Sequence, residues 1–224
     1  MFRSGISPGR NSARCRSLAH CRHIRGRSVN RNPGPRTAHL CVDMQRMFAE
    51  ESPWRMPWME KVVPHAVELT QRHPDRTIFT RFIPPSAPED VPGAWRAYYE
   101  RWEEMTLDHM DRALLGLVEP LQRFVPPARI VNKRYYSAFR QTYLRRILAE
   151  GHYDSLVISG GETDVCVLAT VMAAIDLGFF VFIPDDAICS SSDKFHDCLR
   201  ELYDKRFTSQ IEVTNSEMVL STWV

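Results

Sequence analysis

The chain has 224 residues, of which 44% are hydrophobic, and a formal net charge of +2. This length is enough for one substantial hydrophobic core and predicts one domain, or at most two. No run of eighteen apolar residues occurs, and no apolar segment has the form of a secretory signal, so neither a membrane span nor a signal peptide is expected.

Charge is unevenly distributed along the chain. Residues 1–36 contain nine arginines and no Lys, Asp or Glu, whereas residues 37–224 contain 20 basic and 27 acidic residues, a formal charge of −7. The acidic part argues against nucleic-acid binding by the folded domain. The Arg-rich leader lacks apolar periodicity and is predicted to be disordered. A nucleic-acid or membrane-binding arm, a transit peptide and a meaningless extension all fit its composition, so no function is assigned to it.

The cysteines carry no sign of a disulfide or zinc framework. No two of them form a CxxC pair, and their spacing does not match zinc ligation. A chain of this size needs no disulfides, so a reducing, cytoplasmic setting is expected. Neither a metal ion nor a cofactor is expected. The six are Cys15, Cys21, Cys41, Cys166, Cys189 and Cys198.

The first half of the chain begins with a strand–helix–strand pattern. An apolar strand at 38–42 ends at Asp43, a loop rich in Pro and Trp follows, and apolar residues at helical spacing predict a helix at 59–72. A second strand is predicted at 76–82.

Residues 84–127 are less regular. A short helix there presents an aromatic stripe, and another helix is predicted at about 114–124. The stripe could line a substrate pocket, but packing or an oligomer interface is the favoured interpretation of most of it. Its members are Trp95, Tyr98, Tyr99 and Trp102.

The second half alternates strands and helices to the end of the chain. Because short apolar strands alternate with amphipathic helices throughout, a parallel sheet covered on both faces is predicted. Strands are expected at 128–132, 155–159, 179–184 and 210–213, and helices at 138–150, 163–178, 193–207 and 215–221.

Cys166 follows the strand at 155–159 and the turn Gly160-Gly161, in the first turn of the next helix. Free backbone N–H groups and the helix dipole favour an anion there, so a cysteine at this position can hold its thiolate form at neutral pH. A lone Cys on a helix is nevertheless usually a small structural hydrophobe, so charged partners are needed to support a catalytic role.

Two charged residues meet that condition. Asp43 and Lys133 each follow a strand, and ligands of open parallel sheets bind beyond the carboxyl ends of the strands. Lys133 would favour the thiolate, Asp43 would accept the thiol proton and return it to a leaving amine, and backbone N–H groups of the turn before Cys166 would bind an oxyanion. The alternative is a structural ion pair between Asp43 and Lys133.

Three blocks of sequence surround these residues. They are Asp43-Met44-Gln45-Arg46-Met47-Phe48, Asn132-Lys133-Arg134-Tyr135-Tyr136-Ser137-Ala138-Phe139 and Gly161-Glu162-Thr163-Asp164-Val165-Cys166-Val167. In this order they resemble the signature of the isochorismatase-like cysteine hydrolases. The resemblance covers about residues 37–217 and implies a Rossmann-like, three-layer α/β/α sandwich around a six-stranded, mostly parallel sheet in residues 37–224. It also implies that Asp43, Lys133 and Cys166 form the catalytic triad, that the Gly161–Glu162 bond is cis and that the backbone N–H groups of Glu162 and Cys166 form the oxyanion hole.

Departures from the family pattern indicate the reaction. Nicotinamidases of the family carry metal-binding histidines after the second strand, but residues 80–85 contain none, so a metal site is not expected and nicotinamidase is disfavoured. Isochorismatases of the family lack a cysteine at the position of Cys166. The remaining activity is hydrolysis of a small amide or ureido (carbamoyl) C–N bond through a thioester.

Several alternatives stay open at this stage. The chain could be an isochorismatase-type hydrolase, a nicotinamidase-like amidase or a catalytically silent binding or assembly protein. Phe48, Arg81, Tyr135 and Tyr136 are predicted to line the substrate pocket, although Arg81 could be an exposed charge at a strand end. A homo-oligomer is expected, with no nucleic-acid or membrane partner. Glu162 either points to solvent or contacts substrate.

Overall fold

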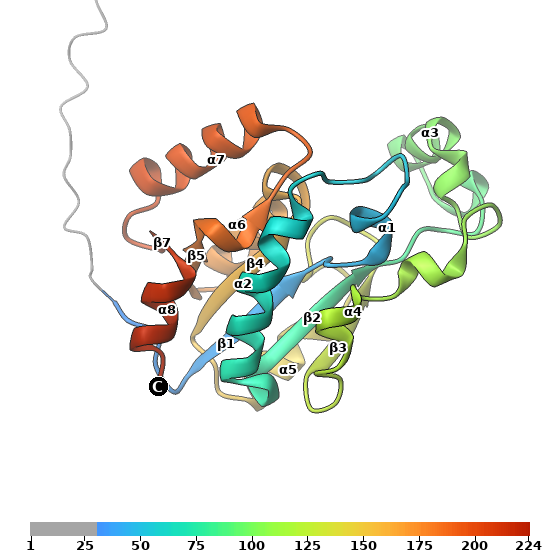
Figure 1. The fold of residues 1–224 in the computed structure, drawn as a ribbon. Coiled ribbons are helices and arrows are strands. Elements are labelled where there is room, and N and C mark those ends of the chain that lie inside the picture. The colour runs from blue at the N-terminus through green and yellow to red at the C-terminus, as the bar shows by residue number, and fades with distance from the viewer. Residues whose placement is uncertain (1–30) are drawn as a thin grey trace, which may run out of the picture.

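A parallel β-sheet forms the centre of residues 31–224, the part of the chain that this computed structural model describes (Figure 1). The strands follow the order β3-β2-β1-β4-β5-β7, and the short β6 pairs with the end of β4. They are β1 (Thr37–Val42), β2 (Thr77–Phe82), β3 (Arg129–Lys133), β4 (Ser155–Gly161), β5 (Phe180–Pro184), β6 (Ile188–Cys189) and β7 (Ile211–Thr214).

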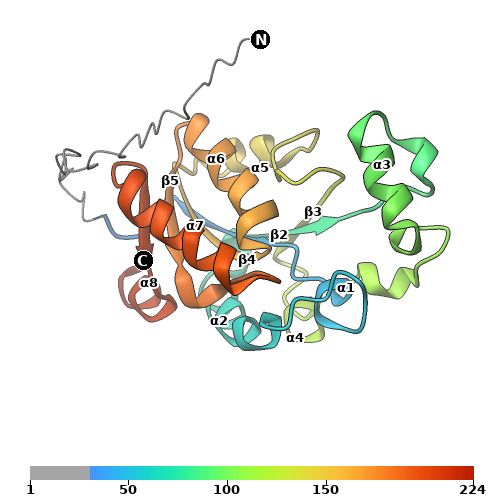
Figure 2. The same ribbon diagram turned by 90° about the horizontal axis from the view of Figure 1, so that it is seen from above.

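Helices cover both faces of this sheet. They are α1 (Arg46–Ala49), α2 (Met59–Arg72), α3 (Ala94–Arg101), α4 (Glu119–Gln122), α5 (Leu144–Glu150), α6 (Leu168–Asp176), α7 (Asp193–Arg206) and α8 (Ser216–Thr222). Figure 2 shows α5 and α6 on one side of the strands and α2 and α4 on the other. Shorter 3₁₀ turns lie at Pro74–Arg76, Pro88–Asp90, Glu103–Met105, Arg112–Leu115 and Asp185–Ala187.

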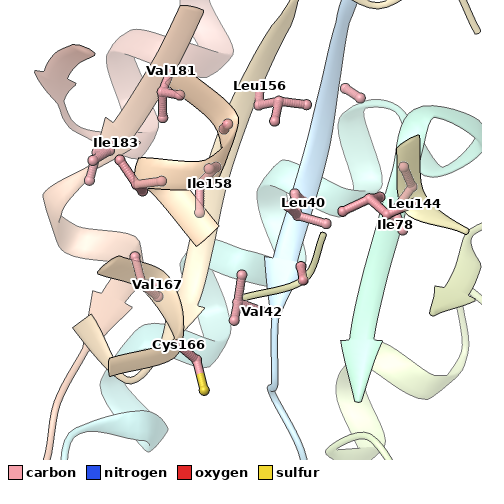
Figure 3. Close-up of a cluster of buried hydrophobic side chains, with 14 of the residues drawn as sticks. Leu40, Val42, Ile78, Leu144, Leu156, Ile158, Cys166, Val167, Val181 and Ile183 are labelled. Atoms are coloured by element: carbon pink, nitrogen blue, oxygen red, sulfur yellow. The ribbon is translucent and has the colours of Figure 1, made fainter. Parts of the chain in front are cut away.

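Alternation along β1 explains the layers. Leu40 packs with α5 and α6 in one cluster of buried residues (Figure 3), whereas its neighbour Cys41 packs with α2 and α4 in another. Successive side chains of a strand point to opposite faces, so a strand buried throughout, as β1 is, needs cover on both. The predicted three-layer α/β/α sandwich is confirmed, with the two-residue β6 as a seventh strand.

Strand register brings the functional residues to one edge. In β1 and β4, Val42 lies opposite Gly160, and in β2 and β3, Phe82 lies opposite Lys133. Asp43 therefore emerges beside the turn that leads to Cys166. Lys133 is separated from β1 by β2, so the three residues do not come from three adjacent strands.

Three predicted helices have different boundaries in the structure. The helix expected at 138–150 begins only at Leu144, because Gln141 has a φ of 55°. That expected at 114–124 is divided by the extended Gly116 into a 3₁₀ turn and the one-turn α4. That expected at 163–178 begins with a π-helical turn, η5 (Thr163–Val167), before α6.

The predicted leader lies mostly outside the described residues, which include only 31–36 of it. Within the described part, Arg36 forms an ion pair with Asp154 and so ties the start of β1 to the loop before β4. No helix of residues 31–224 combines the length and apolar character that crossing a bilayer requires.

Candidate active site

A buried Lys133 joins the other two members of the predicted triad. Its Nζ lies 2.6 Å from Asp43 Oδ2 and donates to Cys166 Sγ at 3.4 Å. The same Nζ donates to the backbone carbonyl of Tyr135 at 3.1 Å. All three triad side chains are buried. The sheet therefore brings a carboxylate, an ammonium and a thiol together at its carboxyl edge.

Thr80, on β2 between the two charged residues, orients Asp43. Its hydroxyl donates to Asp43 Oδ1 at 2.6 Å and accepts from the Asp43 backbone N–H at 3.1 Å. The other carboxylate oxygen, Oδ2, pairs with Lys133. Asp43 is therefore held by a hydroxyl on one oxygen and by an ammonium on the other. Sequence reasoning missed Thr80, whose only signal is a hydroxyl within an apolar strand that ends at the same edge.

Gln45 fixes the loop that follows Asp43. Its side-chain oxygen accepts the Phe82 backbone N–H at 2.6 Å, and its nitrogen donates to the carbonyls of Phe82 at 3.1 Å and Leu115 at 3.0 Å. A fully buried amide with this many partners satisfies its hydrogen-bonding groups and holds two loops together. It was not predicted as a site residue.

Glycine is required where β4 passes close to β1. Gly160 has a φ of 106°, and a Cβ on it would lie 2.0 Å from the carbonyl oxygen of Val42. Only glycine fits this close approach. The next bond, Gly161–Glu162, is cis, as the resemblance implies.

Cys166 lies within η5, near the carboxyl ends of the strands in Figure 3. The backbone N–H groups of Val165 and Val167 both donate to the carbonyl of Glu162, at 3.1 and 3.0 Å. These bonds wind the chain tightly between Glu162 and Cys166. The assignment of the Glu162 and Cys166 N–H groups to an oxyanion hole remains a prediction.

Burial is the largest influence on the pKa of the Cys166 thiol. It raises the pKa of Cys166 to about 12, with the Asp43 charge adding to the rise and the Lys133 charge opposing it. For Lys133, burial acts to lower the pKa, but Asp43 and Cys166 outweigh it and raise the pKa above its ordinary value. Burial thus acts against a thiolate on Cys166, whereas the Lys133 charge favours it.

A cavity of about 420 Å³ opens above Cys166. Most of its wall is apolar or aromatic, and Arg55, Glu162 and Ser191 add polar side chains. The lining residues are Phe48, Pro53, Trp54, Arg55, Phe82, Tyr98, Trp102, Tyr136, Glu162, Val165, Cys166 and Ser191. Phe48 and Tyr136 thus take the predicted place.

Arg81 and Tyr135 do not line this cavity. Arg81 lies on β2, where alternation turns it to the opposite face from Thr80, and its Nε donates to Asn132 Oδ1 at 3.0 Å. The Tyr135 ring instead lies under Arg140, whose Cζ is 4.3 Å from the ring centroid. The prediction of both as pocket residues is wrong, because only the carbonyl of Tyr135 faces the triad.

The aromatic stripe divides between two roles. Tyr98 and Trp102 line the cavity, whereas Tyr99 is buried and Trp95 packs 4.8 Å from Tyr136, measured between ring centroids. Trp54, from the loop before α2, contacts Phe48 and Phe82 of the cavity wall as well as Tyr98 and Tyr99 of α3. It therefore links the stripe to the rest of the cavity wall. The stripe packs within the chain and covers the site.

Glu162 turns toward the loop before α7. Its carboxylate accepts the Ser191 backbone N–H at 3.0 Å and also the Ser191 hydroxyl. Beside it, the Ser190 hydroxyl donates to Asp164 Oδ1 at 2.5 Å. The side chain of Glu162 is therefore neither free in solvent nor aimed only at the cavity. It ties one wall of the cavity to the start of α7.

Within residues 31–224, no three His, Cys, Asp or Glu side chains gather in a way that would hold a metal ion. The stretch after β2 begins with Ile83, Pro84 and Pro85, which offer no ligating side chains.

Comparisons with known proteins agree with this architecture. An uncharacterized isochorismatase family protein, YaaI of Bacillus subtilis (strain 168), is 24% identical over 161 residues, which are 72% of this chain and 83% of that protein. A cysteine hydrolase of Pseudomonas syringae pv. phaseolicola 1448A has a similar structure, with a TM-score of 0.72 and 23% identity over 84% of this chain and 92% of that one. N-carbamoylsarcosine amidase of Thermoplasma acidophilum matches with a TM-score of 0.65 and 18% identity, over 81% of this chain and 97% of that one.

These structural likenesses are of low identity and show the fold. The family model named Isochorismatase domain matches residues 37–215, which include every strand of the sheet and the whole triad. The chain belongs to the isochorismatase family.

Proposed function

We propose that this protein is a cysteine-dependent hydrolase that cleaves a small amide or ureido C–N bond through a thioester on Cys166. The observation that carries the proposal is the position of Lys133 Nζ, 2.6 Å from Asp43 Oδ2 and 3.4 Å from Cys166 Sγ, below a cavity of about 420 Å³. A purely structural ion pair would need neither the thiol nor the cavity. Relatives named as a cysteine hydrolase and as N-carbamoylsarcosine amidase add support.

The first step moves the thiol proton. Burial raises the pKa of Cys166, so Asp43 accepts the proton as the sulfur attacks the substrate carbonyl carbon. The ammonium of Lys133 stabilises the negative charge that develops on the sulfur. The carbonyl oxygen becomes an oxyanion, for which the backbone N–H groups of Glu162 and Cys166 are the proposed donors.

The second step releases nitrogen. Asp43 returns the proton to the leaving nitrogen as the C–N bond breaks, which gives ammonia or an amine and leaves the acyl or carbamoyl group on Cys166. Water, deprotonated by Asp43, then attacks the thioester. As the C–S bond breaks, Asp43 returns this proton to the sulfur and the thiol is restored. Asp43 thus acts first as base and then as acid in each half of the reaction.

Two rival activities predict different behaviour. An isochorismatase-type hydrolase would cleave its vinyl ether without the thiol. A catalytically silent binding protein would bind a small molecule in the same cavity without turnover. Nicotinamidase-like activity is the least supported, because residues 83–85 supply none of the histidines that the family's nicotinamidases use there.

The test is a panel of small amides, ureides and carbamoyl compounds assayed by ammonia release. Wild type and Cys198→Ala, which changes an exposed cysteine on α7, should turn over the same substrate at equal rates. Cys166→Ala should lose at least about 10³-fold in kcat, as expected when a nucleophile is removed. Intact mass spectrometry of wild type mixed with that substrate should show an adduct that is absent from Cys166→Ala.

Full activity of a folded Cys166→Ala variant would exclude the thioester mechanism and favour the isochorismatase-type rival. Circular dichroism of each variant separates loss of chemistry from loss of the fold. If no compound releases ammonia although some bind in calorimetry, the binding-protein rival is favoured.

A further inference from the structure

The wall of the catalytic cavity contains one cationic side chain, Arg55. It takes part in none of the ion pairs within residues 31–224. Residues 1–30 contain no Asp or Glu, so they supply no partner for it either. Lys133 does not line the cavity and is already paired with Asp43. The guanidinium of Arg55 is therefore the unpaired positive charge that a molecule in this cavity would meet.

The loop between α1 and α2 fixes the backbone of Arg55 and leaves its side chain exposed. The Arg55 backbone N–H donates to the Ser52 carbonyl at 3.1 Å, and that of the buried Met56 donates to the Phe48 carbonyl at 2.8 Å. Because the backbone is held on both sides, less conformational freedom is lost when the guanidinium binds a ligand.

Glu162 is the one acidic residue among those that line the cavity. Its carboxylate accepts hydrogen bonds from both the backbone N–H and the hydroxyl of Ser191, which hold it toward the loop before α7. The two charges of the wall therefore differ. Glu162 has its partners within the protein, whereas Arg55 has none among residues 31–224 and is available to a ligand.

The rest of the wall favours a flat, unsaturated ligand. The cavity of about 420 Å³ has room for a molecule much larger than urea, and half of its twelve lining residues are aromatic. Stacked aromatic rings gain more than their buried apolar area alone provides. Cys166 is buried and Arg55 is exposed, so these two residues mark the inner and outer ends of the cavity. The aromatic residues are Phe48, Trp54, Phe82, Tyr98, Trp102 and Tyr136.

We propose that the substrate is an aromatic amide or ureide with a carboxylate distal to the scissile bond, and that Arg55 binds this carboxylate at the outer end of the cavity. Since the reacting carbon must lie at Cys166, this assignment rests on the proposed function. A guanidinium can form two parallel N–H···O bonds with a carboxylate. At an exposed position the anion keeps part of its hydration, so the cost of desolvating it is reduced.

Three benzamides that differ in charge at the 4-position test this preference. They are 4-carbamoylbenzoate, its methyl ester and 4-(aminomethyl)benzamide, and the corresponding phenylureas extend the series to ureides. Calorimetry with Cys166→Ala measures binding without the nucleophile. In at least one series the carboxylate should bind about tenfold more tightly than the ester, as expected for a hydrogen bond to a charged group. The difference should shrink as salt is added.

Further substitutions in the Cys166→Ala protein assign this preference to Arg55. Arg55→Gln should bring the ratio of the two dissociation constants to about one, and Arg55→Glu should favour the aminomethyl compound, because the charge at the outer end is then reversed. The control is Arg145→Gln, which removes an exposed positive charge on α5, outside the cavity, and should keep the full ratio.

An Arg55-dependent preference for the carboxylate would support the site whether or not wild type releases ammonia from these six compounds. Equal or tighter binding of the ester, a preference that survives Arg55→Gln, tightest binding of the aminomethyl compound over the aromatic faces, or no binding of any of the six would overturn it. Failure of the proposed function is seen separately, as ammonia release by Cys166→Ala or as no ammonia release from any compound of the wider panel.

Discussion

Burial disfavours the charged forms of both Cys166 and Lys133. At Lys133 burial is outweighed by Asp43 and Cys166, which raise its pKa, whereas burial raises the pKa of Cys166, whose single neighbouring cation is already paired with Asp43. In the proposed mechanism, activation of the thiol therefore requires transfer of its proton to Asp43.

That difference predicts the pH dependence of alkylation. With a pKa raised to about 12, the thiolate fraction of Cys166 should rise about tenfold per pH unit from pH 6 to 10, so its labelling by iodoacetamide should rise equally. A small thiol with a pKa of about 8.5 should instead level off above that pH. Peptide mass spectrometry after timed labelling gives the rates, and a plateau for Cys166 below pH 8 would contradict the assignment.

A second prediction concerns the Thr80 hydroxyl. Thr80→Val keeps the side-chain shape but removes the hydroxyl that holds Asp43 Oδ1, so kcat should fall by about tenfold, the value of one hydrogen bond to a charged group. KM should be unchanged, because Thr80 does not line the cavity.

Thr80→Ser serves as the matched control for this effect. It restores a hydroxyl at the same position and should recover most of the activity, as steady-state kinetics on the substrate found in the panel would show. An equal loss in both variants would mean that packing around Thr80, and not its hydrogen bond, supports the site.

The residues found from sequence share a simple property. Asp43 directly follows β1, Lys133 is the last residue of β3, and Cys166 comes shortly after the double glycine that ends β4, so strand ends identify them. Thr80 and Ser191 act through contacts across 37 and 29 residues of sequence, to Asp43 and Glu162. No local pattern encodes such pairing, because it depends on the strand order.

Among the elements, β1 carries a buried polar group through the middle of the sheet. His39 has Nε2 2.7 Å from the Ser159 hydroxyl on β4 and Nδ1 3.4 Å from the Thr77 hydroxyl on β2. Burial lowers the pKa of His39 to about 3. The strand thus depends on a neutral imidazole with a hydrogen-bond partner on each side.

This dependence predicts a loss of stability in acid. The pKa of His39 is lower in the folded state than the ordinary value of 6.5, so its contribution to the free energy of unfolding is complete above pH 6.5 and is lost as the pH falls toward 3. At about 1.4 kcal/mol per unit, the loss between pH 6.5 and 4.5 is about 2–3 kcal/mol. Urea unfolding across this range measures it.

His39→Gln is the control, because it keeps a polar side chain on β1 that does not titrate. Its free energy of unfolding should decline less steeply between pH 6.5 and 4.5 than that of wild type. Equal slopes for the two proteins would show that carboxylates elsewhere, and not His39, cause the acid sensitivity.

The regular elements were largely predictable, and the irregular ones were not. Apolar runs locate β1 to β5 and β7 because both faces of the sheet are covered, whereas β6 has only two residues and no periodicity. In residues 84–127, helices of three to eight residues are held by aromatic contacts such as those of Trp54 with Tyr98 and Tyr99. Tertiary packing decides such short elements, so their boundaries are not encoded locally.

At the scale of the whole molecule, charge is segregated along the chain. Residues 1–30 contain seven arginines and no Lys, Asp or Glu, so residues 31–224 have a formal charge of −5. The family match at 37–215 and the proposed catalytic triad lie entirely in the acidic part. Folding and catalysis are therefore expected to be properties of residues 31–224, and attraction to polyanions a property of residues 1–30.

Deleting residues 1–30 tests this division. The shortened chain keeps Arg31, whose guanidinium lies 5.0 Å from the Phe180 ring centroid, and the ion pair between Arg36 and Asp154. Its free energy of unfolding in urea should stay within about 0.5 kcal/mol of the full chain, and kcat/KM should be unchanged, because no described contact is lost. At low salt the full chain should be retained on heparin and the shortened chain should not, since only the former has a basic segment. A fall in the free energy of unfolding of more than about 1 kcal/mol would contradict the division, because residues 1–30 would then contribute to the fold. Equal retention of both chains on heparin would also contradict it, because residues 31–224 would then bind polyanions by themselves.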